Sequence, residues 1–281
     1  MIAVLQYDFM RRALVVGVLL AVIIPCVGVI VVLKRLSMIG DALSHSSLAG
    51  VAAGLIMGVN PILGAGAACV AAALAIEAVR KKIPRYSEMS IAVVMSAGIG
   101  LAGVLSGFVG GGANFNSFLF GSIVAISNFE MYLVIFVSAA VLIAFILLYK
   151  ELFFIALDER AARIAGVPVG AVNFIFTLLT AVTMSVAARA VGALIVSSMM
   201  VVPVACAMQL SRSYKQTVVF SVAFAVVFTL FGLAFSYYAR LKPGATIVLA
   251  GVLCLVVIIC GKRIWGKLRE RQRRPYENED A

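Results

Sequence analysis

Histidine is almost absent from this chain, and charge of either sign is scarce. Its 281 residues include one histidine and one tryptophan, and only 12% are charged, whereas 64% are hydrophobic. So few ionisable groups exclude a soluble domain with a solvated surface, and the mean hydropathy of +1.14 is that of an integral membrane protein. We therefore expect an all-α polytopic membrane protein.

Further absences narrow the class of protein. The five cysteines lie in apolar stretches without a Cys-x-x-Cys spacing, so we expect neither a disulfide framework nor a thiolate metal site. No Gly-x-x-x-x-Gly-Lys-[Ser/Thr] phosphate-binding loop occurs, so the chain cannot hydrolyse ATP alone. The polar segments are too short to form a separate soluble domain.

The apolar residues occur in stretches of about 20 residues, the length needed to cross a hydrocarbon core about 30 Å thick. The sequence predicts nine transmembrane helices: 13–33, 36–58, 61–79, 90–109, 129–149, 169–187, 190–210, 217–238 and 244–260. The second and the seventh of these are the least purely apolar. Residues 1–261 would form one membrane domain, and residues 262–281 a cytoplasmic tail that is first basic and then acidic.

Most of the 23 lysine and arginine residues fall on one side of this nine-helix arrangement. Because basic residues concentrate on the cytoplasmic side of membrane proteins, we expect the N-terminus outside and the C-terminus in the cytoplasm. Arg11 and Arg12 fall on the opposite side, so eight helices with a cytoplasmic N-terminus stay open. This distribution accounts for the net charge of +11 without a nucleic-acid partner.

The single histidine, His45, lies four residues after Asp41 in the second predicted span. Residues four apart share one face of a helix, so the carboxylate and the imidazole point the same way. A carboxylate near the bilayer centre costs about 2.5–3.5 kcal/mol and normally faces a polar path or a partner. A divalent metal ion fits this pair; a buried Asp–His hydrogen bond that stabilises helix packing is the alternative. No cysteine or methionine cluster lies nearby in the sequence, which disfavours Cu(I).

The most informative polar segment covers residues 158–168. Its acidic start suits a helix N-terminus, and Gly166 followed by Pro168 suits the end of a helix. We expect a two-turn helix outside the membrane, either a solvated connector or a docking surface. Asn60 before Pro61, and the capping-box pattern Ser127-x-x-Glu130, predict two further helix starts.

Four blocks of residues resemble the permease subunits of bacterial ABC importers for zinc, manganese and iron. They are residues 35–50, with the pattern Gly-Asp-x-x-x-His, and residues 119–122, 158–168 and 191–203. The resemblance runs from about residue 8 to residue 260 and leaves out the basic tail. The residues flanking His45 are most similar to those of the zinc-type members.

The resemblance implies a homodimer in the bacterial inner membrane, with two cytoplasmic ATPase subunits and an extracellular metal-binding protein. It implies that Asp41 and His45 form the metal path. It gives the role of ATPase coupling to Asp158, Glu159, Arg160, Arg163 and Gly166. The chain would be a transport subunit and no enzyme, with no permanently bound cofactor.

Donor chemistry favours zinc as the cargo. Two copies meeting at a symmetry axis would supply two aspartates and two histidines, which satisfy the four ligands of tetrahedral zinc. Manganese or iron is the alternative within this family, and manganese would need further oxygen ligands from water, Ser44 or Ser47.

Two other classes of protein stay open on the residues alone. An intramembrane hydrolase would need a serine beside His45, and Ser44 or Ser47 lacks the Gly-rich setting of a nucleophile. A secondary carrier would use Asp41 and His45 as a proton relay. A neighbouring ATPase gene would favour the ABC importer over the carrier.

Overall fold

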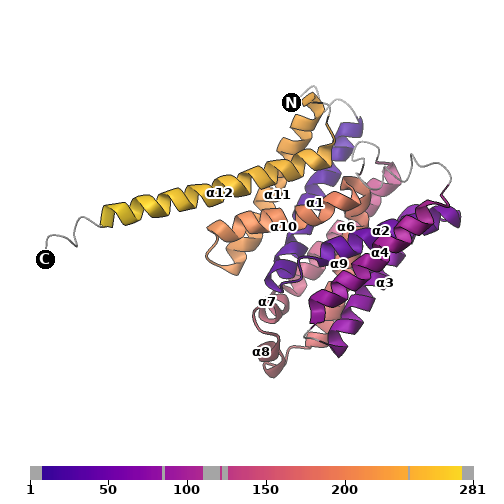
Figure 1. Cartoon of the computed structure of the whole chain (residues 1–281), viewed down its shortest axis with the longest axis horizontal. Helices are drawn as coiled ribbons and strands as arrows, with labels where there is room; N and C mark the ends of the chain where they lie inside the picture. The colour runs from indigo at the N-terminus through magenta and orange to yellow at the C-terminus, as the bar shows by residue number, and fades with distance from the viewer. Residues whose placement is uncertain (1–7, 84–85, 110–120, 122–125, 240, 274–281) are drawn as a thin grey trace.

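The computed structural model describes residues 8–83, 86–109, 121, 126–239 and 241–273 (Figure 1). Every element in these residues is a helix, which confirms the all-α prediction. The helices are α1 (Asp8–Leu33), α2 (Ile39–Ile56), α3 (Pro61–Lys82), α4 (Ser87–Ser106), α6 (Asn128–Leu147), α7 (Tyr149–Leu157), α8 (Glu159–Ile164), α9 (Val169–Val191), α10 (Ala193–Leu210), α11 (Tyr214–Ala239) and α12 (Pro243–Arg273).

The expected count of nine membrane spans is not supported. Within the described residues, seven helices are long and apolar enough to cross a membrane, namely α1, α3, α4, α6, α9, α11 and α12. The second and seventh predicted spans correspond to α2 and α10, which have 18 residues each. Polar side chains interrupt α2, and α10 counts as a shorter apolar helix over Ile195–Leu210. The predicted sides of the two termini are not supported either.

Helix α1 forms the centre of the bundle. It contacts α6, α9, α10 and α11, and its side chains Leu20, Ile23, Ile24 and Ile30 are fully buried. The outer helices present large apolar side chains instead, such as Phe136 of α6, which is 74% exposed. A soluble protein would not expose such residues in number, whereas lipid tails accommodate them.

Helix α2 is enclosed by neighbours, because small residues let their backbones come close. It packs mainly on α3 and α4, and also touches α9 and α10. A methyl group built on Gly50 of α2 would lie 2.2 Å from the carbonyl oxygen of Gly64 in α3. One built on Gly98 of α4 would lie 2.9 Å from the backbone nitrogen of Ser46. Glycine is required at these crossings, as expected for packed membrane helices.

Both predicted helix starts are confirmed. The side chain of Asn60 accepts a hydrogen bond from the backbone nitrogen of Ile62 at 2.9 Å, with Pro61 in the first position of α3. Ser127 and Glu130 form the reciprocal capping box that begins α6. These local signals fix where two long helices enter the bundle.

Helix α12 continues beyond the bundle (Figure 1). It is a single helix from Pro243 to Arg273, and its apolar part ends at Ile264. The predicted boundary between membrane domain and tail, at residues 261 and 262, falls inside this helix and stays a prediction.

Candidate metal path and coupling segment

Asp41 and His45 lie one turn apart near the start of α2, as the spacing predicts. Both side chains are half-buried, and neither makes a hydrogen bond or an ion pair in the part of the chain that the structure describes. The Asp–His hydrogen bond that the packing alternative requires is therefore not formed. Of the neighbouring serines, Ser46 donates a hydrogen bond to the carbonyl of Ala42 at 2.8 Å, whereas the hydroxyl of Ser44 is buried and has no partner among the described residues.

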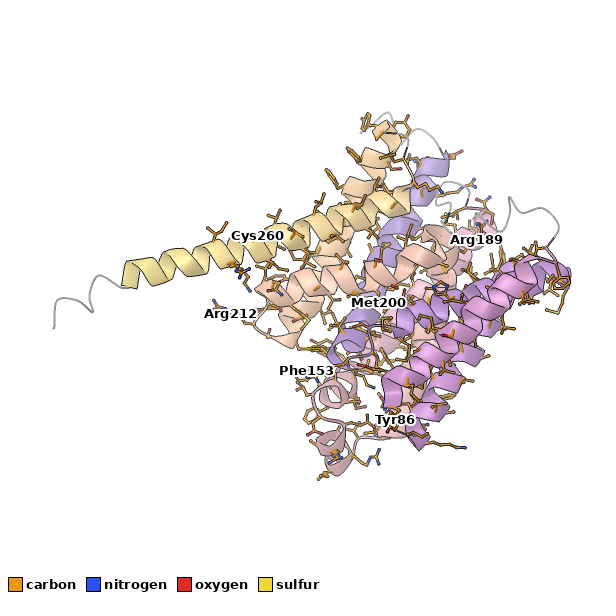
Figure 2. All side chains as sticks on the ribbon, viewed as in Figure 1. Tyr86, Phe153, Arg189, Met200, Arg212 and Cys260 are labelled. Atoms are coloured by element: carbon orange, nitrogen blue, oxygen red, sulfur yellow. The ribbon has the colours of Figure 1, made fainter. Side chains whose placement is uncertain are left out.

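The start of α2 lies inside the bundle because the chain reverses tightly after α1. Arg35 adopts a left-handed backbone conformation with φ of 57°, and α2 begins at Ile39, three residues later than expected. Gly28 of α1 and Gly40 of α2 both pack against Met200 of α10. Figure 2 labels Met200 in the interior of the bundle, between Arg189 near one end and Phe153 and Tyr86 near the other. Asp41 thus follows a residue surrounded by other helices.

Two methionines that are distant in the sequence pack against Gly40, the residue before Asp41. A methyl group built on Gly40 would lie 2.8 Å from Cε of Met200 and 3.4 Å from Cε of Met184. Both methionines are fully buried. The sequence, which shows no cysteine or methionine cluster near Asp41, did not indicate that these two methionines reach Gly40. Their methyl ends fill the space left by Gly40, which is a packing role.

One copy of the chain supplies too few ligands for a closed metal centre. Among the described residues, no three His, Cys, Asp or Glu side chains come close enough to hold a metal ion. A structural zinc site takes four ligands. Asp41 and His45 are two ligand-type side chains, so a metal bound to them would need further ligands from outside this copy of the described chain.

The segment predicted outside the membrane forms α8, with the expected start and end. The carboxylate of Asp158 accepts hydrogen bonds from the backbone nitrogens of Arg160, at 2.8 Å, and Ala161, at 3.1 Å. Gly166 ends the helix with φ of 85°, which favours glycine. Glu159 and Arg163 face each other at 3.7 Å, and both are exposed along with Arg160.

The helix before this segment was not expected. Helix α7 buries Leu152 and Ile155, and two of its aromatic rings pack at a tilt against Tyr214 at the start of α11. The ring centres of Tyr149 and Phe153 lie 4.9 Å and 4.6 Å from that of Tyr214. The apolar residues of α7 recur at helical spacing, a signal that was available in the sequence. Its effect is to tie the α7–α8 segment to the bundle.

Two of the motifs that suggested a family touch each other. Most of residues 119–122 lies outside the described residues, but Gly121 is described and has φ of 69°. A methyl group on Gly121 would lie 2.2 Å from the carbonyl carbon of Val191, in the motif of residues 191–203. In that motif, Gly192 separates α9 from α10 with φ of 108°. Two blocks far apart in sequence thus form one contact.

A family model for the ABC 3 transport family matches residues 6–262. The chain belongs to this family. A Treponema pallidum protein whose name assigns it to a metal transport system is 35% identical over 257 residues, which are 91% of this chain and 96% of the relative. The manganese transport system membrane protein MntC of Listeria monocytogenes is 31% identical, with coverage of 97% and 98%.

A solved structure has the same fold over nearly the whole chain. PsaBC from Streptococcus pneumoniae in complex with Fab superimposes with a TM-score of 0.82 at 26% identity, over 92% of this chain and 95% of that chain. The resemblance drawn from the four motifs is therefore confirmed. This ABC 3 family member is a multi-pass membrane protein and the permease of a metal ABC transporter, a transport component rather than a catalytic one.

Proposed function

We propose that this chain forms the membrane path of an ATP-driven importer for a divalent transition metal, and that Asp41 and His45 bind the metal in transit. One observation carries the proposal: the two ligand-type side chains share a face of a helix enclosed by α3, α4, α9 and α10, and both stay free of protein partners in the described residues. A carboxylate without a partner inside a membrane bundle is costly, and a divalent cation offsets that cost.

A transport site has to bind its cargo and then release it. Two copies of the chain, related by a symmetry axis, would bring together two aspartates and two histidines, and their separation would open the site. The ATP would be hydrolysed on separate subunits, since the sequence has no phosphate-binding loop. We propose that these subunits dock on α8, where Asp158, Glu159, Arg160 and Arg163 lie outside the apolar spans and Gly166 ends the helix.

The cargo is proposed from two arguments that point to different metals. Nitrogen and oxygen donors in a set of four suit zinc. Relatives from Listeria and from Streptococcus gordonii are named for manganese, which favours manganese as the first cargo to test. Manganese accepts the same donors and completes its coordination with water. Iron is the third candidate of this class.

The decisive experiment measures uptake of radioactive manganese and zinc in cells that lack the natural gene and carry each variant. Asp41→Ala and His45→Ala should each lower uptake by more than about tenfold, because each removes a direct ligand. Ser46→Ala is the matched control on the same helix, since the Ser46 hydroxyl donates its hydrogen bond within α2, to the carbonyl of Ala42. Membrane abundance should be equal in all four proteins.

Uptake of both metals at the wild-type rate by both variants would refute the metal path. Uptake that persists without any ATPase subunit would instead support an ion-coupled secondary carrier. The metal that the wild type takes up, and whose uptake falls in both variants, is the cargo; competition alone does not identify it, because zinc binds such sites more tightly than manganese whether or not it is transported.

A further inference from the structure

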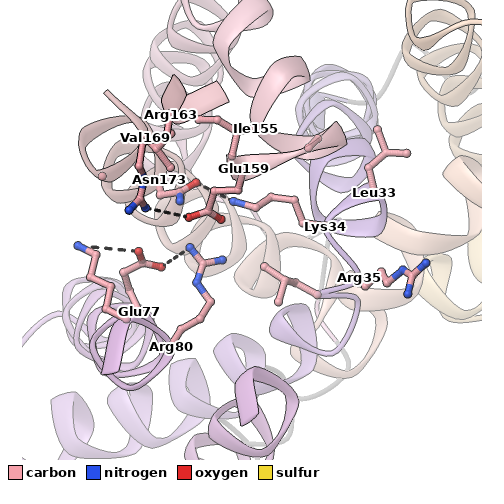
Figure 3. A pocket seen from close by; sticks show the side chains of 14 residues that line it. Leu33, Lys34, Arg35, Glu77, Arg80, Ile155, Glu159, Arg163, Val169 and Asn173 are labelled. Atoms are coloured by element: carbon pink, nitrogen blue, oxygen red, sulfur yellow. Dashed lines mark hydrogen bonds and ion pairs between the residues drawn. The ribbon is translucent and has the colours of Figure 1, made fainter. Parts of the chain in front are cut away.

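A basic cavity of about 510 Å³ lies beside α8, where the ends of α1, α3, α7 and α9 meet (Figure 3). Five basic and two acidic side chains line it: Lys34, Arg35, Arg80, Lys81, Arg163, Glu77 and Glu159. Such an excess of positive charge repels a divalent cation, so the cavity does not belong to the metal path. It attracts an anionic group instead.

Both carboxylates in the cavity are already neutralised by neighbours on their own helices. Glu77 contacts Arg80 at 2.8 Å and Lys81 at 3.9 Å, all on α3. Glu159 contacts Arg163 one turn along α8 at 3.7 Å. Two acids beside five basic residues therefore leave the cavity with an excess of positive charge.

Lys34 and Arg35 are the two cations of the cavity that form no ion pair among the described residues, and Lys34 is the more buried of them. It follows the last residue of α1, and its Nζ donates a hydrogen bond to the neutral side chain of Asn173 at 2.6 Å. The ring of Phe176 lies 5.9 Å from the same nitrogen. Figure 3 shows Lys34, Asn173 and Glu159 pointing toward one another. An ammonium group has three donors, so two stay available to an incoming acceptor.

Burial disfavours the charged form of this lysine. Desolvation, helped by the nearby charge of Arg80, lowers the pKa of Lys34 to about 8, against the opposing effect of Glu159 and Glu77. An anion placed against Lys34 would restore the stability of the charged form. The geometry of the cavity and this unbalanced charge point to the same kind of ligand.

We propose that the cavity is a binding site for a carboxylate side chain presented by the ATPase subunit, with Lys34 as its direct partner. This inference rests on the proposed docking of that subunit at α8. The cavity shares Glu159 and Arg163 with α8, so an acidic residue of a protein seated on α8 would reach it. Buried charge-assisted hydrogen bonds of this kind are the strong ones, and they fix the register of a docked partner.

The test measures binding of the purified ATPase to the full chain in nanodiscs of uncharged phosphatidylcholine. Lys34→Met keeps the apolar stem and should weaken binding by about tenfold, with a shallower dependence on salt. Lys215→Met is the matched control, because Lys215 is an exposed lysine at the start of α11, next to the Tyr214 that α7 packs against.

Asn173→Asp separates a docking role from a structural one. It places a carboxylate against Lys34, at the position where Asn173 now accepts its hydrogen bond. If Lys34 only fastened α1 to α9, this variant would bind the ATPase as well as the wild type or better. We expect weaker binding by about tenfold, since the new carboxylate occupies the site that the partner's acid needs.

Unchanged affinity of both variants, with the wild type binding normally, would overturn the inference and leave the proposed function intact. A loss of affinity that appears only in nanodiscs containing phosphatidylglycerol would also overturn it, because the occupant would then be a lipid headgroup. Failure of the wild-type chain to bind the ATPase at all would instead count against the proposed function.

Discussion

At the scale of single residues, one buried ion pair fastens α6 to α9. The Oε1 atom of Glu130 accepts a hydrogen bond from Nε of Arg189 at 2.8 Å, while Oε2 accepts one from the backbone nitrogen of Ser127. Glu130 is 8% exposed. The same carboxylate thus caps a helix and holds the end of its neighbour.

Glu130→Gln should destabilise the protein by about 3 kcal/mol, toward the low end for a broken buried pair because the Arg189 side chain is 23% exposed. Thermal unfolding in detergent measures the effect. The control is Asp8→Asn, which breaks a 4.0 Å pair with Arg11 between largely exposed side chains. That variant should unfold like the wild type. Equal unfolding temperatures for Glu130→Gln and Asp8→Asn would contradict the stabilisation of about 3 kcal/mol that we assign to the Glu130–Arg189 ion pair.

The sequence allowed some of these residues to be placed and not others. The i, i+4 spacing was enough to put Asp41 and His45 on one face, and local motifs were enough for the caps of α3, α6 and α8. The contact of Lys34 with Asn173 joins residues 139 apart, and no local pattern encodes it. The same holds for Met184 and Met200, which reach Gly40 only through the packing of three helices.

At the scale of elements, α8 is a short helix whose surface charges are available to a partner. Exchanging its charges with Glu159→Arg and Arg163→Glu keeps the pair one turn apart, so the helix should persist. We expect metal uptake and metal-stimulated ATP hydrolysis to fall about fivefold or more, equivalent to about 1 kcal/mol of docking energy.

The control for this exchange is Glu88→Lys, an exposed acidic residue in the first turn of α4, just after the connection from α3. It should couple ATP hydrolysis to uptake as the wild type does. Normal coupling in the α8 double variant as well would identify this helix as an ordinary connector.

The crossing of α2 and α3 depends on glycine. Gly50→Ala would place a methyl group 2.2 Å from the backbone oxygen of Gly64, so one helix has to move. We expect a loss of about 1–3 kcal/mol in unfolding experiments, as for other overpacked contacts. Gly100→Ala on α4 meets nothing within 4 Å and should be neutral or slightly stabilising. A neutral Gly50→Ala would show that the two helices are not held at this distance.

At the scale of the whole molecule, composition was a good guide to class and a poor guide to the number of spans. Seven of the nine predicted stretches are helices that can cross a membrane, because twenty apolar residues leave the chain little alternative. The other two, α2 and α10, have 18 residues each and pack against each other inside the bundle. The length of about 20 residues is needed to cross the hydrocarbon core of a bilayer, and it does not apply to helices that are packed mainly against other helices.

The basic residues of the whole molecule are unevenly distributed. Basic side chains from α1, α3 and α8 gather at one end of the bundle, around the cavity, although they are far apart in the sequence. The positive-inside pattern indicated that one side of the protein is basic. It did not show that these basic residues line one cavity together with Lys34. The role of the basic tail, residues 262–281, stays a prediction.

Because the chain has a single histidine, His45 can serve as a spectroscopic probe of the predicted metal path. Isotope labelling of histidine, in protein purified without a histidine tag, would give imidazole signals from His45 alone. Two copies in a symmetric pair would give one set of signals, and a transport step in which the copies differ would split it in two. Each state of the cycle could then be followed at the metal path without altering any residue.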